Sequence, residues 1–246
     1  GGYMWGFVRG DFGESFRFRG QPVRGLIVKK MWVSAQLTLA ALAISIGFGL
    51  PLGFFVAHKQ GHWLDPTVVT TSLILMSILP MLSVPSLLWL FCLKLHWVPC
   101  SGSPWEGFLH PRIVVPAIAM GLPGIAGFVR LMRASTLDVF GQDFVRTARA
   151  KGLTTARIDA RHVLRNAIIP IVTVLAFTLA GLVSGALVVE NIMGIPGVGF
   201  FSVQSVFNRD YPVVMAIALI AATFFVLATL LADVAYAFVD PRIRYQ

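Results

Sequence analysis

Long apolar blocks alternate with short polar segments along this chain. Five of the blocks carry little or no charge, and each is close to the roughly 20 residues that an α-helix needs to cross a lipid bilayer. These blocks cover residues 33–57, 66–93, 112–133, 167–189 and 212–238. The pattern therefore predicts an all-α fold, that of a polytopic helical membrane protein with five spans.

The third and fourth blocks are separated by a strongly basic segment, residues 134–166. Its charged residues are Arg146, Arg149, Lys151, Arg157, Arg161 and Arg165, against Asp138, Asp143 and Asp159. A helix-favouring stretch from Asp143 to Lys151 ends at Gly152, the residue type best suited to the left-handed turn that closes a helix. A second amphipathic stretch, 154–166, follows. We predict two short helices joined by a glycine turn, and we call residues 143–165 the elbow.

Composition supports the membrane assignment. Hydrophobic residues make up 57% and charged residues 13% of the chain, whereas soluble domains have about 45–50% and about 25%. A formal net charge of +9 would suit nucleic-acid binding in a soluble protein, but here the basic residues collect in segments expected on the cytoplasmic side of a membrane. We therefore expect no nucleic-acid partner. Cys92 and Cys100 lack metal-ligand spacing and support no disulfide framework.

The distribution of charge also predicts the orientation. The basic segment 134–166 belongs in the cytoplasm, because positive residues near span ends stay on that side. This orientation places residues 58–65 and 239–246 inside, and residues 1–32, 94–111 and 190–211 outside. Lys29 and Lys30 then flank the first span on the outer side, against the rule. An additional helix upstream of this sequence would remove the conflict.

Polar residues within the apolar blocks leave two interpretations open. The second block holds Pro80 and Pro85 together with the hydroxyl residues Ser72, Ser77, Ser83 and Ser86. Such a block either lines a water-filled path or forms an ordinary kinked helix whose serines bond to their own backbone. The candidates for a translocation path are Ser77, Pro80, Ser83, Thr173 and Ser184. Asp233, near the end of the fifth block, is either functional or engaged in helix pairing or head-group contact.

Two loops attract attention without indicating a metal or nucleotide site. His58 and His62 have i,i+4 spacing, but Gly61 between them favours a polar interfacial turn over a metal site. Residues 193–199 are rich in glycine and predict tight turns. They neither follow a strand nor open a Rossmann helix, so a dinucleotide site is excluded by context. The amphipathic stretch 200–207 lies along the membrane surface or folds back into the protein.

Catalytic motifs are missing from the sequence. It contains no Gly-x4-Gly-Lys-Ser/Thr loop and no converging nucleophilic or metal constellation. Scattered histidines argue against an integral membrane enzyme: His58, His62, His96, His110 and His162. A secondary transporter or channel would need intramembrane charges on several helices, and only Asp233 and Glu190 qualify. This class remains the alternative, and we expect a non-catalytic chain.

Several longer motifs carry a resemblance to a known family. They lie at residues 9–15, 146–152, 161–170, 189–190, 196–199, 208–214 and 240–244. They resemble the permease subunits of bacterial ABC importers of the dipeptide/oligopeptide/nickel (binding-protein-dependent) family, first-permease type. The family's cytoplasmic loop carries a Glu-Ala-Ala-x3-Gly pattern. Here Arg146 replaces the glutamate and Thr147 the first alanine, a form typical of the peptide permeases.

The resemblance implies an ABC importer type I-like transmembrane domain over residues 33–246, after an extracytoplasmic segment 1–32. Family members usually have six spans. It implies that the elbow docks on an ATPase subunit through Arg146, Thr147, Ala148, Arg149, Ala150, Lys151, Gly152, Leu153 and Arg157, with the small residues Ala148, Ala150 and Gly152 allowing close approach. The expected outer gate and binding-protein contact comprises Glu190, Pro196, Gly197, Gly199, Asn208, Arg209, Asp210 and Tyr211.

The same resemblance implies the partners. They are a second permease subunit in a heterodimer, two ATPase subunits that bind ATP and Mg²⁺, an extracytoplasmic solute-binding protein and the lipid bilayer, with no cofactor on this chain. The expected location is the cytoplasmic (inner) membrane of a bacterium or archaeon. We expect an importer of peptides. Dipeptides, longer peptides, nickel complexes, opines and glutathione all remain open as substrates, because specificity in such systems lies largely in the binding protein.

Overall fold

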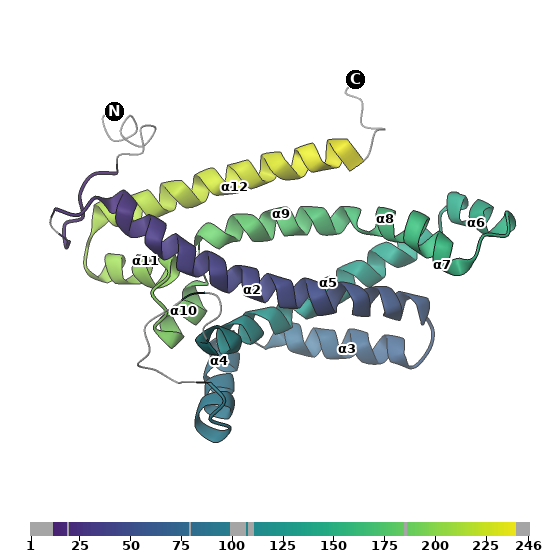
Figure 1. The fold of residues 1–246 in the computed structure, drawn as a ribbon, viewed down its shortest axis with the longest axis horizontal. Coiled ribbons are helices and arrows are strands. Elements are labelled where there is room, and N and C mark those ends of the chain that lie inside the picture. Colours follow the sequence, from purple (N-terminus) through teal and green to yellow (C-terminus); the bar gives the residue numbers. More distant parts are fainter. Residues whose placement is uncertain are drawn as a thin grey trace. The chain divides into compact units, whose positions relative to one another are not determined.

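The computed structural model describes residues 12–18, 20–78, 80–98, 107, 111–184 and 186–239. The tail 240–246, residues 9–11 of the first family motif and the side chains of Pro80, Ser184 and Asp233 lie outside that description. The described part is helical (Figure 1), and its β interactions are limited to a single bridge between Glu14 and Pro22. The prediction of an all-α fold is confirmed for this part of the chain.

The helices follow one another with short connections. In chain order they are α2 (Val23–His58), α3 (Leu64–Ser77), α4 (Pro80–Leu88), the π-helix η1 (Trp89–Lys94), the 3₁₀-helix η2 (Pro111–Ile113), α5 (Val114–Phe140), α6 (Asp143–Ala150), α7 (Thr155–Ile158), the π-helix η3 (Asp159–Val163), α8 (Leu164–Ala167), α9 (Ile169–Ser184), α10 (Leu187–Met193), α11 (Val198–Phe207) and α12 (Tyr211–Val239). Within the described residues, 3 helices are long and apolar enough to cross a membrane, or up to 6 segments if each bent pair counts as one span. Five spans lie within that range.

The sequence led us to expect one helix in each apolar block. In the structure, the second and fourth blocks are each broken into two helices. In the second block α3 ends at Ser77 and α4 begins at Pro80, because a proline lacks a backbone N–H and restricts the residue before it. In the fourth block α9 ends at Ser184 and α10 begins at Leu187. There the Glu190 carboxylate accepts a hydrogen bond of 3.1 Å from the N–H of the α10 N-cap residue, which favours a new helix start.

The chain forms two compact units, each with its own apolar core. Unit 1 comprises Gly1–Ala41, Leu79–Met120 and Thr178–Thr229, and unit 2 comprises Leu42–Ile78, Gly121–Phe177 and Leu230–Gln246. Helices α2, α5, α9 and α12 contribute residues to both units. The elbow belongs entirely to unit 2, and the segment 190–211 belongs entirely to unit 1.

Unit 1 explains why α2 begins earlier than the apolar block that predicted it. The sequence suggests a polar segment up to residue 32, but the helix already begins at Val23. Val23 and Ile27 lie one turn apart and are fully or almost fully buried with Phe201 of α11 and Val213 of α12. This apolar stripe gives the start of α2 a core to pack against, although Lys29 and Lys30 lie between it and the apolar block.

Close packing between α2 and α5 in unit 2 depends on glycines of α2. A Cβ added at Gly49 would lie 2.7 Å from Phe128 Cβ, and one at Gly53 would lie 2.6 Å from the Val129 carbonyl oxygen. Both distances are far below van der Waals contact. Small residues at these positions therefore allow the two backbones to approach, as they do in membrane helix pairs generally.

One negative expectation from the sequence is wrong. Cys92, in η1, is buried and disulfide-bonded. Disulfides persist in oxidising compartments, and η1 adjoins the segment 94–111 that we expect on the outer side of the membrane. The number of cysteines alone did not reveal the bond, since pairing depends on spacing in the fold.

Candidate functional site

The elbow begins with a short helix that ends as its sequence predicts. Helix α6 stops at Ala150, and Gly152 follows with φ of +76°. The Gly152 N–H donates to the Arg149 carbonyl at 2.9 Å, and the Leu153 N–H donates to the Ala148 carbonyl at 3.3 Å. These two bonds form a Schellman motif, which needs a left-handed residue at the glycine position. The turn is therefore fixed by backbone geometry.

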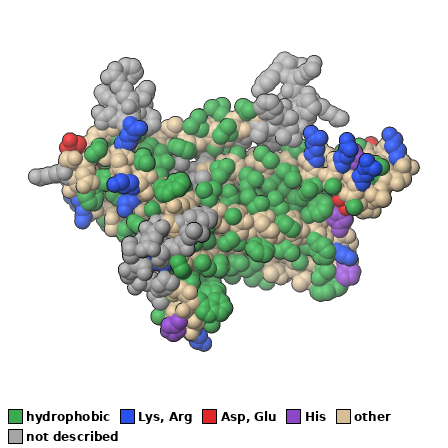
Figure 2. Space-filling model, viewed as in Figure 1, with side chains coloured by type: hydrophobic (Ala, Val, Ile, Leu, Met, Phe, Trp, Pro, Cys, Tyr) green, Lys and Arg blue, Asp and Glu red, His purple; other side chains and the backbone are tan. Residues whose placement is uncertain are grey.

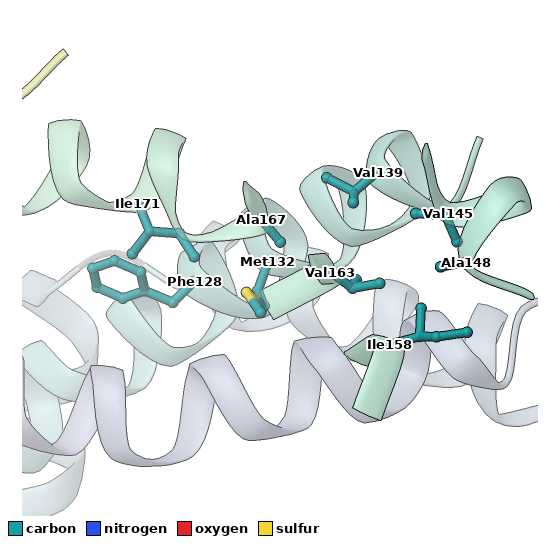
Figure 3. Packing of buried hydrophobic residues seen from close by; sticks show 9 residues of the cluster. All are labelled: Phe128, Met132, Val139, Val145, Ala148, Ile158, Val163, Ala167 and Ile171. Atoms are coloured by element: carbon teal, nitrogen blue, oxygen red, sulfur yellow. The ribbon is translucent and has the colours of Figure 1, made fainter. Parts of the chain in front are cut away.

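One face of α6 is inserted into the core of unit 2. Val145 and Ala148, three residues apart, are buried together with Ile158 and Val163 from the following helices (Figure 3). The same cluster continues to Met132 of α5 and to residues of α8 and α9. The expectation that Ala148 belongs to an exposed docking surface is wrong, because its place on the helix turns it toward this core.

The opposite face of the elbow is exposed and basic. The Phe144 side chain is 43% exposed. The elbow also exposes Arg146, Thr147, Arg149, Ala150, Lys151, Gly152 and Arg157, and Leu153 is half-buried. Lys and Arg side chains gather over the part of the molecule where Figure 1 labels α6 and α7 (Figure 2). The one ion pair on α6, Arg146 with Asp143 at 3.8 Å, is highly exposed and stabilises little. These cations are thus available to an acidic partner.

The second half of the elbow is held to the neighbouring helices by polar contacts. The His58 Nε2 atom, at the end of α2, lies 2.9 Å from the Asp159 carboxylate, which begins the π-helix η3. The His58 ring packs edge-on against Phe140 at 5.0 Å between ring centroids. The Ser135 hydroxyl of α5 donates to the Ala167 carbonyl at 2.8 Å, where α8 ends. The polar turn predicted at His58 is therefore the place where α2 joins the elbow.

A second group of candidate residues surrounds a buried carboxylate in unit 1. Glu190 is fully buried, and its carboxylate accepts hydrogen bonds from the Ser34 hydroxyl at 2.6 Å and from the Phe200 N–H at 3.0 Å. Ser34 also accepts a bond of 2.8 Å from the Val198 N–H. The carboxylate thus binds the N-terminus of α11 and stabilises it by charge and hydrogen bonding. A Cβ at Gly197 would collide with both Glu190 and Ser34.

The end of α11 closes the same segment. Arg209 has φ of +55° and occupies the position that normally carries a glycine. The next residue, Asp210, is buried and accepts bonds from the Ser15 hydroxyl at 2.5 Å and the Phe16 N–H at 3.2 Å. These contacts tie the residues before α2 to the residues before α12.

These positions correct part of the expected outer contact. Glu190, Gly197, Gly199 and Asp210 are buried inside unit 1, so their side chains shape the segment, and their part in a partner contact stays a prediction. The exposed members are Asn208, Arg209 and Tyr211, and Pro196 is half-buried. Sequence reasoning missed Ser34, because nothing near it in the chain indicates that it meets a carboxylate 156 positions away.

The expected translocation-path residues are not brought together by a described contact. The Ser77 hydroxyl donates to the Leu73 carbonyl at 2.9 Å and the Ser86 hydroxyl to the Leu82 carbonyl at 2.7 Å, as in an ordinary helix. Ser83 is half-buried in α4 and Thr173 is half-buried in α9. Their role in a path stays a prediction. Among the residues that the structure describes, no group of three or more His, Cys, Asp or Glu side chains could hold a metal ion.

Comparison with known proteins identifies the family of the chain. Residues 49–245 match the model of the family described as "Binding-protein-dependent transport system inner membrane component". The oligopeptide transport system permease protein OppB of Haemophilus influenzae is 33% identical over 99% of this chain and 79% of its own length. AppB of Bacillus subtilis, a permease of the same description, is 35% identical over the same shares.

A solved structure shows the same fold. The inward-facing MetNI methionine ABC transporter matches with a TM-score of 0.69 at 17% identity, covering 88% of this chain and 97% of that chain. The fold of a type I ABC importer transmembrane domain is thereby confirmed. This chain belongs to the family of binding-protein-dependent transport system inner membrane components.

Proposed function

We propose that this chain is the membrane-spanning permease subunit of an ATP-driven, binding-protein-dependent importer of peptides. The observation that carries the proposal is the identity of 33% to 35% with permeases named for oligopeptide transport, which extends over 99% of the chain. The relatives are named as permeases, and we infer that ATP is hydrolysed on partner subunits and not here. The multi-pass helices and the family place the chain in a bacterial inner membrane.

The elbow is the proposed contact with an ATPase subunit. Its buried face fixes α6 to unit 2, while its outer face presents an exposed aromatic ring, several cations and the small residues Ala150 and Gly152. Such a surface fits a partner groove that has an apolar pocket for Phe144 and acidic residues around it. An aromatic anchor in a pocket contributes much of the energy of an interface, and rim charges contribute orientation and rate.

The remaining partners are also proposals, supported by the family of the chain. The proposed complex contains a second permease subunit, two ATPase subunits and an extracytoplasmic solute-binding protein. Binding of ATP would close the ATPase pair and move the elbow, and the spans would then open toward the binding protein. On the outer side, Asn208, Arg209 and Tyr211 are the exposed candidates for contact with the binding protein.

A pair of phenylalanines tests this assignment. Phe144 of α6 and Phe207 of α11 are both exposed, at 43% and 83%, and each can be replaced by p-benzoylphenylalanine with little change of shape. In the assembled importer we expect the photoreactive group at Phe144 to crosslink to the ATPase subunit. The group at Phe207 should crosslink to the binding protein and not to the ATPase. Crosslinking to the ATPase from Phe207 alone would contradict the proposal.

Transport itself distinguishes the proposal from a secondary transporter. Proteoliposomes containing the purified complex should accumulate a labelled peptide only when ATP, the ATPase subunits and the binding protein are all present. Uptake by this chain without the ATPase, driven by an ion gradient, would overturn the proposal. The crosslinking result is independent of the peptide chosen, so a wrong substrate and a wrong mechanism give different outcomes.

A further inference from the structure

A cavity in unit 2 lies between α3 and α5. Its volume is about 490 Å³, within the range of roughly 300–1,000 Å³ of ligand sites in proteins. α3 contributes Val69 and Met76, and α5 contributes Gly127, Arg130, Leu131, Arg133 and Ala134. Apart from Arg133, the α5 residues have the spacing i, i+3, i+4, i+7 of a single helical stripe. The cavity is therefore an apolar groove with arginine at its wall.

The two arginines beside the cavity differ in their partners. Arg133 donates to both carboxylate oxygens of Asp65, from Nε at 2.5 Å and from Nη2 at 2.8 Å. Arg130 also lines the cavity, and in the part of the chain that the structure describes its hydrogen-bond partner is the Met76 sulfur, at 3.5 Å. A thioether is a weak acceptor and carries no charge. The Arg130 guanidinium thus retains an uncompensated positive charge next to an apolar groove.

The depth of the cavity follows from the same contacts. Asp65 lies in the first turn of α3, which begins directly after the short turn that we expect on the cytoplasmic side. Its bidentate pair with Arg133 therefore places that part of α5 near the inner membrane surface. Arg130 lies about one helical turn, roughly 5 Å, deeper. From that depth an arginine side chain extends toward the phosphate layer while its stem remains in apolar surroundings.

We propose that this cavity binds an anionic phospholipid of the inner leaflet, with the lipid phosphate at Arg130 and an acyl chain along Val69, Met76 and Leu131. Basic pockets between transmembrane helices on the cytoplasmic side have the chemistry for such head groups. The open volume beside Gly127 admits the chain, because a Cβ added there would meet no heavy atom within 4 Å. Lipid binding at this cavity would be a property separate from peptide import.

The test measures lipid retained by the intact importer complex. The complex is purified from nanodiscs that contain phosphatidylglycerol and phosphatidylethanolamine with identical acyl chains, and the bound lipid is counted by native mass spectrometry. Arg130→Gln should lower retained phosphatidylglycerol about fivefold, the contribution of one arginine near a charged membrane surface. Arg130→Lys should keep the preference for phosphatidylglycerol. Gly127→Leu should lower retention of both lipids by filling the groove.

Arg24→Gln is the matched control. Arg24 is an exposed arginine at the start of α2 that does not line the cavity, so its loss should leave lipid retention unchanged. Unchanged phosphatidylglycerol in both Arg130→Gln and Gly127→Leu would overturn the proposal. Loss of the second permease subunit with unchanged lipid would also overturn it, since the groove would then be a protein interface. If Arg130→Gln does not assemble, Gly127→Leu decides, because its new side chain enters open space.

Discussion

Substitution of Gly152 tests whether the elbow docks on a partner, because it should affect docking much more than folding. Gly152 has φ of +76°, and a Cβ there would meet no heavy atom of this chain within 4 Å. Gly152→Asp therefore causes backbone strain but no collision. An L-residue in the left-handed region costs about 1–2 kcal/mol, with Asn and Asp among the better tolerated. We expect the free energy of unfolding to fall by about 1 kcal/mol, which lowers Tm by roughly 2–4 °C.

The effect on transport should be much larger than the effect on stability. If an ATPase subunit covers Gly152, the new carboxylate is buried without a partner. Such burial costs several kcal/mol, and each 1.4 kcal/mol or so corresponds to a factor of ten in affinity. We expect ATP-dependent uptake and co-purification of the ATPase to fall by more than about tenfold.

Two comparators separate strain, size and charge. Gly152→Asn introduces a side chain of the same size without charge and should show a smaller loss of transport. Gly61, in the turn between α2 and α3, has φ of +78° and equally open surroundings. Gly61→Asn should thus lose similar stability and keep full transport. Peptide uptake, ATPase pull-down and thermal unfolding are measured on all three variants. Wild-type uptake by Gly152→Asp, or an equal loss in Gly61→Asn, would refute the reasoning.

Two further predictions concern packing inside each unit. Gly49→Ala should lower the free energy of unfolding by about 1–3 kcal/mol because its Cβ would lie 2.7 Å from Phe128 Cβ. A Cβ at Gly47, two residues earlier, would meet no heavy atom within 4 Å, so Gly47→Ala should raise the free energy of unfolding by about 0.5–1 kcal/mol. Equal Tm values of the two variants in detergent would contradict this. Glu190→Gln should cost about 1.5–3 kcal/mol, the value of a hydrogen bond to a charged group. Glu190→Ala should cost more, because two backbone N–H groups lose their acceptor, and equal losses would argue against the network.

The elbow could be predicted because its signals are local. Gly152 follows a run of good helix formers, and a left-handed cap is the ordinary reason for a glycine in that place. The predicted helix from Asp143 to Lys151 differs from α6 by a single terminal residue. The face of α6 was also encoded: Val145 and Ala148 have the i,i+3 spacing of a buried stripe. The resemblance to a docking motif led us to place Ala148 outside, where the periodicity alone indicated inside.

The buried polar contacts could not be predicted in this way. Glu190 and Ser34 are 156 positions apart, and Asp210 and Ser15 are 195 apart. Neither pair leaves a pattern in the surrounding sequence, because the two partners come into contact only when the helices pack. The breaks at Pro80 and before Leu187 fall inside continuous apolar blocks. Hydropathy gives the length of such a block but does not show where its helix bends. Sequence therefore indicates which segments enter the membrane more readily than where they bend.

The packing of unit 2 determines how a displacement of the elbow would be transmitted. The buried cluster runs without interruption from Val145 of α6 through Met132 and Phe128 of α5 to Ile171 of α9. A close-packed interior has low compressibility and transmits strain. Movement of α6 by a partner would then displace the ends of α5 and α9 instead of bending the elbow. The His58–Asp159 pair links the end of α2 to the same cluster of unit 2. The unit 2 parts of α2, α5 and α9 would therefore move together.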